Sequence, residues 1–276
     1  MINRNTLLLE AIKSAYNAGK EIMDIYNHYD FNVEYKADES PLTLADKKSN
    51  DIIANHLEQL YIPLLSEEGK DIPYEERKDW DIFWLIDPLD GTKEFIKRNG
   101  EFTVNIALIE KTKPVLGVIY APVLDDLYYA EELLGSKKIS HFSALAKMEE
   151  ERINIMPDMG IDLPLDNGAK RPFTIVGSRS HMSEENKQYY EKLKEEHDNI
   201  NIISKGSSLK ICMVAEGSAD EYPRFGPTME WDTAAGHAIA TYANCSVFVK
   251  GSNDPLTYNK EKLLNPHFII KRNNKF

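Results

Sequence analysis

The chain has 276 residues, 42% of them apolar and 28% charged, which is the composition of an ordinary globular protein. Its 33 basic and 45 acidic residues give a formal net charge of −12, which argues against a protein that binds the phosphate backbone of a nucleic acid. No apolar run approaches about 18 residues, so we expect no membrane span. Two cysteines are too few for a disulfide framework or a zinc ligand set, and they favour a reducing compartment.

The first part of the chain is predicted to begin with two helices and to continue with strands. Apolar residues between 8 and 26 recur at steps of three and four, which indicates one helix, and a second is expected over 44–60. A short apolar run at 62–65 precedes a polar stretch that we expect to form an exposed loop. The run IFWLI at 82–86 predicts a buried strand because it is short and rich in aromatic and branched residues. Further strands are expected at 102–109, 115–120 and 127–130.

The second part of the chain shows alternating strand and helix signals, which indicate an α/β organisation. Before it, residues 131–170 change in composition and predict either a connection between two domains or an outlying hairpin. We therefore predict an α+β domain over 1–150 and an α/β domain over 151–276, with the boundary left open within 131–170. The expected strands are 173–177, 201–204 and 245–250, and the expected helices run from Ser183 to about His197, from after Ser208 to about Gly217, and from about Trp231 to about Asn244.

Carboxylates follow short apolar runs at several points. Asp87 comes directly after the run at 82–86, and Asp90 and Gly91 follow it closely. A carboxylate at the end of a buried strand needs solvent, a partner or a metal. Asp87, Asp90 and the main-chain carbonyl of Leu89 can converge on one hard cation such as Mg²⁺, and the residues after Gly91 can offer N–H groups to a phosphate. For this segment alone, the alternative is an ordinary Asp-Pro turn.

Two more acidic positions have a similar setting. Glu67 and Glu68 follow a short apolar run, and Asp232 stands at the predicted start of a helix. Each has a simpler explanation, because Glu67 and Glu68 can belong to a charged loop and Asp232 can cap its helix. Their occurrence together with the Asp87 segment favours a shared site.

These motifs together resemble those of the inositol monophosphatase superfamily of Mg²⁺-dependent, lithium-sensitive phosphatases. The motif D-P-hydrophobic-D-G-T/S stands at 87–92, the motif W-D-x-A-A-G stands at 231–236, and the upstream acidic pair stands at 67–68. Within the superfamily, the chain looks like the branch of 3′(2′),5′-bisphosphate nucleotidases, to which the segments 40–50, 93–96 and 206–240 are similar. The resemblance covers nearly the whole chain and is weakest over 131–170. It implies a two-part layered fold of alternating helix and sheet layers.

The resemblance also implies roles for individual residues. The implied ligands of two or three Mg²⁺ ions are the carboxylates of Glu67, Asp87, Asp90 and Asp232 and the main-chain carbonyl of Leu89. The implied catalytic residues are Thr92, which would orient the attacking water, and Asp46 or Glu67, which would accept its proton. The implied substrate contacts are Glu67, Leu89, Asp90, Gly91, Thr92, Ser207, Lys210, Arg224 and Asp232. Lys210 and Arg224 would supply positive charge to a second phosphate, and the alternative for both is a surface cation.

The activity implied by the resemblance is removal of the 3′-phosphate of 3′-phosphoadenosine 5′-phosphate, which leaves AMP and phosphate and would serve sulfur assimilation or nucleotide recycling. Two alternatives stay open: an inositol or sugar monophosphatase, and a catalytically silent nucleotide-binding sensor. The expected partner is a small phosphorylated nucleotide, without a nucleic acid polymer and without stable membrane insertion, and the oligomeric state is left open. We expect a cytoplasmic location, with peripheral attachment to the inner membrane face as an alternative.

Overall fold

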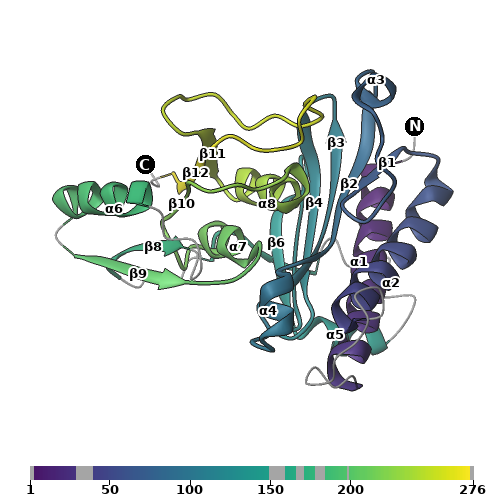
Figure 1. The fold of residues 1–276 in the computed structure, drawn as a ribbon. Helices are drawn as coiled ribbons and strands as arrows, with labels where there is room; N and C mark the ends of the chain where they lie inside the picture. Colours follow the sequence, from purple (N-terminus) through teal and green to yellow (C-terminus); the bar gives the residue numbers. More distant parts are fainter. Residues whose placement is uncertain are drawn as a thin grey trace.

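The structure is a computed structural model that describes residues 3–28, 40–148, 159–165, 171–177, 184–197 and 199–273. Its strands form two sheets, and helices lie on both sides of each sheet (Figure 1). In the described ranges, no helix is long and apolar enough to cross a membrane.

Two long helices, α1 (Arg4–His28) and α2 (Pro41–Leu57), cover one face of the larger sheet. In α1 the buried apolar residues recur three and four positions apart, as an amphipathic helix requires. The start of α2 is stabilised by Ser40, whose hydroxyl accepts a hydrogen bond of 3.2 Å from the backbone N–H of Thr43. A short 3₁₀ helix, η2 (Glu58–Leu60), follows directly.

The larger sheet contains seven strands in chain order, so each strand pairs with its neighbour in the sequence. The first two strands are parallel and all later pairs are antiparallel. The strands are β1 (Leu64–Ser66), β2 (Ile82–Asp90), β3 (Thr103–Glu110), β4 (Lys113–Ala121), β5 (Asp126–Glu131), β6 (Gly135–Ser140) and β7 (Ile161–Asp162). Three short helices accompany them: α3 (Tyr74–Arg77), α4 (Thr92–Ile96) and α5 (Phe142–Met148).

Strand β2 shows why this sheet is buried on both faces. Trp84 and Ile86 belong to the core under α1 and α2, whereas Phe83 and Leu85 belong to the core on the opposite face. Successive side chains of a strand point to opposite faces. A strand covered on both sides therefore reads as a continuous apolar run, which explains the sequence IFWLI.

The smaller sheet has five strands in the order β11-β12-β10-β8-β9. Helices α7 (Leu209–Glu216) and α8 (Glu230–Tyr242) lie between the two sheets, and α6 (Glu184–Glu196) lies on the outer side of the smaller sheet (Figure 1). The strands, in the order of the sheet, are β11 (Cys245–Val249), β12 (Phe268–Arg272), β10 (Glu221–Arg224), β8 (Phe173–Gly177) and β9 (Ile200–Ser204).

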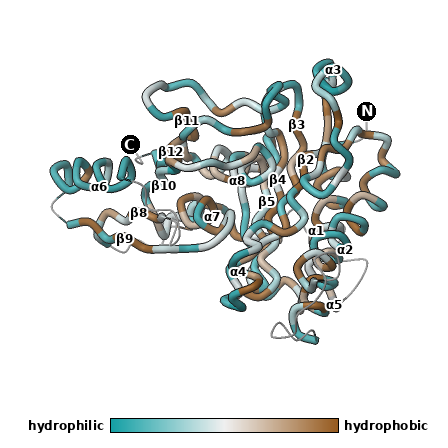
Figure 2. The backbone as a smooth tube through the Cα atoms, viewed as in Figure 1, coloured by the Kyte–Doolittle hydropathy of each residue, from teal (hydrophilic) through white to brown (hydrophobic). Residues whose placement is uncertain are grey.

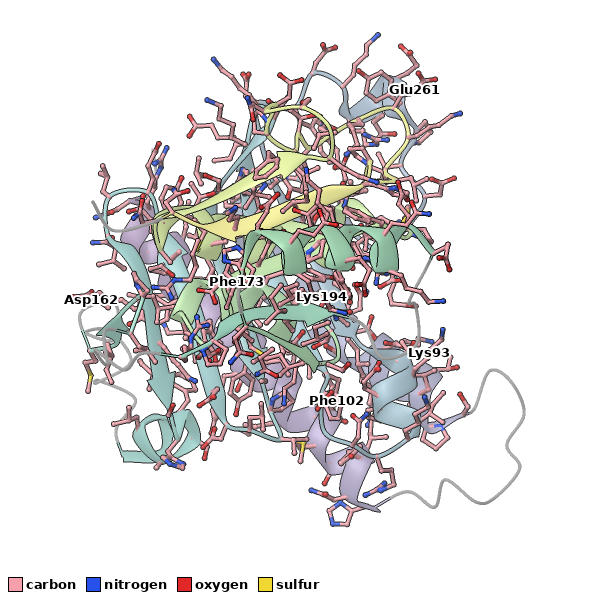
Figure 3. All side chains as sticks on the ribbon, turned by 90° about the vertical axis from the view of Figure 1, so that its left-hand side faces the viewer. Lys93, Phe102, Asp162, Phe173, Lys194 and Glu261 are labelled. Carbon is pink, nitrogen blue, oxygen red and sulfur yellow. The ribbon has the colours of Figure 1, made fainter. Side chains whose placement is uncertain are left out.

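The close packing of α8 on the larger sheet depends on one glycine. A Cβ atom at Gly117 on β4 would lie 2.3 Å from the carbonyl oxygen of Ala235, so a larger residue there would push α8 away. Apolar segments concentrate along the central strands, whereas α6 is largely hydrophilic (Figure 2). Seen from the side of α6, the polar side chains of this helix, including the labelled Lys194, project outward (Figure 3). The layered α+β and α/β fold class predicted from the sequence is thereby confirmed.

Most predicted elements are confirmed, with several corrections. Strand β2 does not end at residue 86 but continues through Asp90, because Asp87 pairs with Asn105 and Asp90 pairs with Thr103 across an irregular step. The loop expected after residue 69 contains α3, and β10 and β12 were not predicted. Ser183, the expected cap of α6, lies outside the described residues.

The described parts of the segment 131–170, predicted to be a connection between domains or an outlying hairpin, contribute β6 and β7 to the larger sheet. The change of sheet falls between β7 and β8. The division into domains at 1–150 and 151–276 stays a prediction.

Candidate active site

The acidic motif residues gather where β1 and β2 end. Asp87, Leu89 and Asp90 all lie on β2, and Glu67 directly follows β1, the parallel neighbour of β2. The backbone N–H of Glu67 donates a hydrogen bond of 3.2 Å to the carbonyl oxygen of Ile86, which keeps Glu67 beside Asp87. The side chain of Leu89 packs in the core under α1 and α2, so this residue has only its backbone to offer to the site.

Two helices supply the remaining carboxylates. Asp46 is buried on α2, and the hydroxyl of Ser49 on the same helix donates a hydrogen bond of 2.7 Å to the carbonyl oxygen of Pro88. This hydrogen bond connects α2 to the motif at residues 87–92. Asp232 lies in the first turn of α8, where its Oδ2 accepts a hydrogen bond of 2.9 Å from the backbone N–H of Met229. Asp232 is therefore not the N-cap residue that the sequence suggested. Met229 holds that position, and Asp232, three residues later, accepts a hydrogen bond from its backbone N–H.

Four of these carboxylates influence the fifth, Asp87, electrostatically. Its side chain is 1% exposed, and burial raises the pKa of Asp87 well above its usual range. The negative charges of four other carboxylates raise this pKa further, in decreasing order Asp90, Glu67, Asp232 and Asp46. The sequence prediction that these residues come together is consistent with this mutual influence.

Three other members of the group are perturbed in the same direction. Burial, followed by the charges of Glu68 and Glu67, raises the pKa of Asp46 to about 8. Burial and the charge of Asp90 raise the pKa of Asp232 to about 7, although the hydrogen bond from Met229 lowers it. Burial also raises the pKa of Glu67, as do the charges of Asp90 and Glu68. Asp46 and Asp232 therefore hold protons near neutral pH unless a cation takes their place.

The proposed ligands are all oxygen atoms, which is the ligand type that suits a hard divalent cation. They belong to carboxylates and a backbone carbonyl, the oxygen ligands that Mg²⁺ prefers. As the side chains stand, no group of three or more His, Cys, Asp or Glu residues in the described ranges is arranged to hold a metal ion. Carboxyl oxygens instead accept bonds from internal donors, including the N–H of Leu89, which lies 3.1 Å from Oδ1 of Asp87. Coordination would therefore require some of these side chains to turn.

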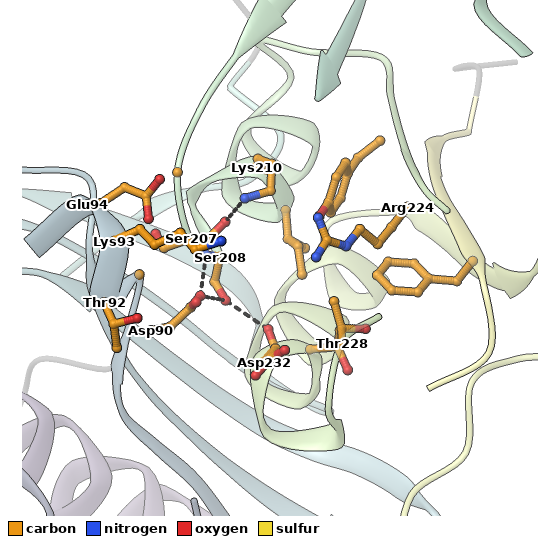
Figure 4. A pocket seen from close by; sticks show the side chains of 16 residues that line it. Asp90, Thr92, Lys93, Glu94, Ser207, Ser208, Lys210, Arg224, Thr228 and Asp232 are labelled. Atoms are coloured by element: carbon orange, nitrogen blue, oxygen red, sulfur yellow. Dashed lines mark hydrogen bonds between the residues drawn. The ribbon is translucent and has the colours of Figure 1, made fainter. Parts of the chain in front are cut away.

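Ser208, at the start of α7, contacts both Asp90 on β2 and Asp232 on α8. Its backbone N–H and its hydroxyl lie 2.5 and 2.8 Å from Oδ2 of Asp90, and its hydroxyl lies 2.9 Å from the carbonyl oxygen of Asp232 (Figure 4). Asn105 on β3 donates to the Ser208 hydroxyl at 2.9 Å and to Asp90 at 3.4 Å. The position of Asp90 therefore depends on groups from β3 and α7, which are distant in the sequence.

A cavity of about 200 Å³ opens beside the carboxylates. Asp90 and Asp232 lie at one side of it, and Lys210 and Arg224 lie at the other (Figure 4). Further lining residues are Gly91, Thr92, Lys93, Glu94, Gly206, Ser207, Ser208, Ile211, Tyr222, Thr228, Thr233 and Phe268. The cavity thus places an acidic side and a basic side within one small space.

Backbone geometry at Gly91 lets other chain segments approach the acidic side closely. Gly91 has φ +100°, and a Cβ atom there would lie 3.1 Å from the carbonyl oxygen of Glu101 and 3.2 Å from Cβ of Ser207. Only glycine adopts this conformation without strain. Helix α4 then begins at Thr92, as expected for the residues after Gly91. Ser207 also has a positive φ of 46°, a strained conformation for a residue with a side chain.

The basic side consists of two cations with different environments. Lys210 is 7% exposed, its Nζ donates to the carbonyl oxygen of Ser207 at 2.6 Å, and burial lowers the pKa of Lys210 to about 8. Arg224 on β10 donates to the carbonyl oxygen of Pro227 at 2.9 Å, whereas its buried Nε has no hydrogen-bond partner within the described part of the chain. The interpretation of Lys210 as a surface cation is therefore wrong, because its side chain is buried against the cavity.

Every site residue proposed from the sequence is in the described part of the structure and lies in or beside this region. The motifs did not indicate Ser208 and Asn105, which orient Asp90, nor Glu101, whose carboxylate accepts a hydrogen bond of 2.8 Å from the N–H of Gly206. Ser208 lies within a segment similar to the nucleotidase branch, but nothing local distinguishes it from Ser207. Asn105 is a buried polar residue in a predicted strand, and such residues generally require a partner.

Comparison with known proteins identifies the class. The model of the inositol monophosphatase family matches residues 3–275, and the chain belongs to this family. A solved inositol monophosphatase from Zymomonas mobilis has the same fold, with a TM-score of 0.71 at 21% identity, and the match covers 95% of this chain and 90% of that one.

Closer relatives fall within one branch of the family. The chain is 46% identical over 269 residues to the 3′(2′),5′-bisphosphate nucleotidase CysQ of Salmonella typhimurium, a match that covers 96% of this chain and 99% of that protein. It is 45% identical to CysQ of Escherichia coli K12 with the same coverage. The crystal structure of CysQ from Bacteroides thetaiotaomicron superposes with a TM-score of 0.91 at 49% identity, covering 98% of both chains.

Proposed function

We infer that this protein is a 3′(2′),5′-bisphosphate nucleotidase that hydrolyses the 3′-phosphate of 3′-phosphoadenosine 5′-phosphate. Full-length identity of about 45% to curated CysQ proteins supports the activity. The cavity is the main evidence for the class of substrate, because Asp90 and Asp232 line it together with Lys210 and Arg224. A substrate with two phosphates would use both sides, one for the reaction and one for binding.

On the acidic side, we propose that Glu67, Asp87, Asp90, Asp232 and the carbonyl of Leu89 hold two or three Mg²⁺ ions. When bound, Mg²⁺ supplies positive charge next to the phosphate and makes a water molecule more acidic. The raised pKa values of Asp87 and Asp232 support this assignment. Burial and then the charges of neighbouring carboxylates disfavour their ionised forms, and a bound cation would offset both effects.

The chain's own residues would orient the reactants. The backbone N–H groups of Gly91 and Thr92 would contact the phosphate that is removed, and the Thr92 hydroxyl would orient the attacking water. Asp46 or Glu67 would accept the proton of that water, and both carboxyl groups have raised pKa values, as a proton acceptor working near neutral pH requires. Ser208 would keep Asp90 in position during the reaction.

On the basic side, Lys210 and Arg224 would bind the 5′-phosphate, and Ser207 would contact the nucleotide. The unpartnered Nε of Arg224 supports an anionic ligand, because guanidinium groups bind phosphate through paired N–H donors. A role in sulfur metabolism follows from the proposed substrate. The cytoplasmic location stays a prediction, and attachment to the inner membrane face finds no support.

The experiment is a comparison of phosphate release from 3′-phosphoadenosine 5′-phosphate, inositol 1-phosphate and fructose 1,6-bisphosphate, with and without Mg²⁺. We expect the nucleotide to be the preferred substrate, Mg²⁺ to be required, and Li⁺ to inhibit. Faster turnover of inositol 1-phosphate would reassign the protein to the inositol phosphatases of the family. If Mg²⁺ supports no turnover of any of the three while the nucleotide still binds, the sensor alternative would hold.

A further inference from the structure

A second cavity, of about 510 Å³, lies beside the C-terminal half of helix α8, away from Asp232. Its walls come from the turn between β3 and β4, from α8 itself, and from β11 with the loop that follows it. None of its lining residues lines the cavity at the carboxylates. Its volume is within the usual range for small-molecule sites, which is about 300 to 1,000 Å³.

More of the exposed surface of this cavity is apolar than polar, and Pro114, Tyr242, Phe248 and Pro255 contribute rings to its lining. The walls contain no carboxylate or guanidinium group. Lys113 is the one permanently charged lining residue, and its side chain is exposed to solvent. Aromatic and proline rings favour contact with a planar ligand, and the absence of an internal counter-charge disfavours an ionic one.

His237 places a single hydrogen-bonding group at this cavity. Its side chain is only 7% exposed, and its Nδ1 lies 2.9 Å from the hydroxyl of Tyr258. Burial lowers the pKa of His237 to about 4, so the ring is neutral at physiological pH. A phenol is the stronger donor of the two, so we assign the proton of this bond to Tyr258 and the ring proton to Nε2.

The Nε2 atom of His237 therefore has a proton to donate. In the described ranges, the imidazole forms no hydrogen bond other than the one to Tyr258. Nε2 is not among the fully enclosed polar atoms that lack a partner in the described residues, and His237 lines the cavity, so water reaches this donor from there. A ligand acceptor placed in the cavity would take over the hydrogen bond from water.

We propose that this cavity is a second binding site, for an uncharged planar small molecule that accepts a hydrogen bond from Nε2 of His237. Aromatic amides and uncharged heteroaromatic rings with an acceptor atom belong to this class. The proposal concerns binding alone and does not depend on which phosphate ester the enzyme hydrolyses.

The test uses benzamide as the probe and follows the amide signals of the full-length protein by NMR. We expect benzamide to shift signals from the C-terminal half of α8 and from residues 245–257. Ethylbenzene, which lacks an acceptor, should bind about tenfold more weakly, the effect of one ordinary hydrogen bond. Benzoate, which has the same shape and a negative charge, should also bind more weakly.

Two substitutions locate the site. Thr241 lines the cavity but is exposed, so Thr241→Trp should fill the space without removing a buried group and should abolish the shifts, whereas Thr241→Ser should preserve them. His237→Phe should weaken benzamide binding about tenfold and leave ethylbenzene unaffected. Undiminished binding of benzamide to the Thr241→Trp protein, no binding to the wild type, or equal binding of benzoate would each overturn the proposal.

Discussion

Two acidic residues in the first turn of α8 have opposite surroundings. Glu230 is fully buried, and its carboxylate accepts hydrogen bonds from the backbone N–H groups of Asn259 and Lys260, at 2.7 and 3.0 Å, and from the Lys260 ammonium group at 2.6 Å. Asp232, two residues later, has its pKa raised to about 7 by burial and by the charge of Asp90. The Glu230 carboxylate is held by three donors from residues 259–260, whereas Asp232 accepts one backbone hydrogen bond, from Met229, and is close to the charge of Asp90.

This difference, rather than burial, distinguishes a carboxylate that stabilises the fold from one that we propose as a metal ligand. Breaking a satisfied buried charge pair destabilises the fold. A cluster of like charges instead stores unfavourable electrostatic energy that a bound cation would release. We therefore expect substitutions at Glu230 to lower the stability of the protein. Substitutions of the clustered carboxylates, which are Asp46, Glu67, Asp87, Asp90 and Asp232, should instead lower the rate of turnover.

The largest expected effect is on catalysis. Asp90→Asn keeps the size of the side chain but removes one negative charge from the proposed metal site. We expect kcat to fall by about a thousandfold, because metal ions supply several kcal/mol of transition-state stabilisation. Phosphate-release kinetics would measure this loss, and circular dichroism would verify that the protein is folded. A near-normal rate would refute the assignment of Asp90 as a ligand.

Glu230→Gln is the matched substitution on the structural side of the comparison. It leaves the Lys260 ammonium group without its charged partner, and we expect the free energy of unfolding to fall by about 3 kcal/mol. Urea denaturation measures this change. The folded fraction should retain kcat within a few-fold of the wild type, and an unchanged midpoint or a loss of activity like that of Asp90→Asn would contradict the comparison.

Lys210→Met tests the basic side of the cavity. We expect KM for the bisphosphate nucleotide to rise about thirtyfold, equivalent to about 2 kcal/mol, because a buried charge contact is lost. Hydrolysis of a substrate with a single phosphate should change little. Since the pKa of Lys210 is about 8 in the free protein, the wild-type KM should rise as the pH increases through 8. The Lys210→Met protein should lack this rise, and a parallel rise in both proteins would exclude Lys210 as its cause.

The smallest effect concerns the stability of the metal-free protein. The folded pKa of Asp46 is about 8, above its ordinary value of 3.8, so the folded state binds a proton that the unfolded chain releases. The free energy of unfolding should therefore fall as the pH rises from 6.5 to 8, by up to about 1.4 kcal/mol per pH unit for each such proton. Denaturation in EDTA measures this slope.

Asp46→Asn should make the slope shallower, and Mg²⁺ should oppose the loss of stability. The contribution of His237 to stability changes with pH in the opposite direction, because burial lowers its pKa to about 4. This contribution is lost only as the pH falls below about 6.5. The interval from 6.5 to 8 thus excludes His237, while Lys210, whose pKa of about 8 gives a contribution that rises with pH, acts mainly at its upper end. Stability that rises with pH in EDTA would contradict the proposed repulsion within the cluster.

Much of the fold could be predicted from local patterns. The spacing of apolar residues in α1 predicts a helix because one face of it is buried, and the run IFWLI predicts a strand buried on both faces. Strands β10 and β12 were missed, because EYPR contains a proline and polar residues and FIIKR is short. Both obtain their pairing from distant strands of the smaller sheet.

By itself, the sequence determined the family resemblance, the layered fold class and the set of acidic residues, because these depend on short motifs with local spacing. Only the tertiary structure decided which groups surround each carboxylate. Ser208 and Asn105 reach Asp90 from α7 and β3, and Glu230 finds its donors near residue 260. Such contacts join segments far apart in the chain, so the physical difference between a satisfied and a repelled carboxylate is invisible in the sequence around either one.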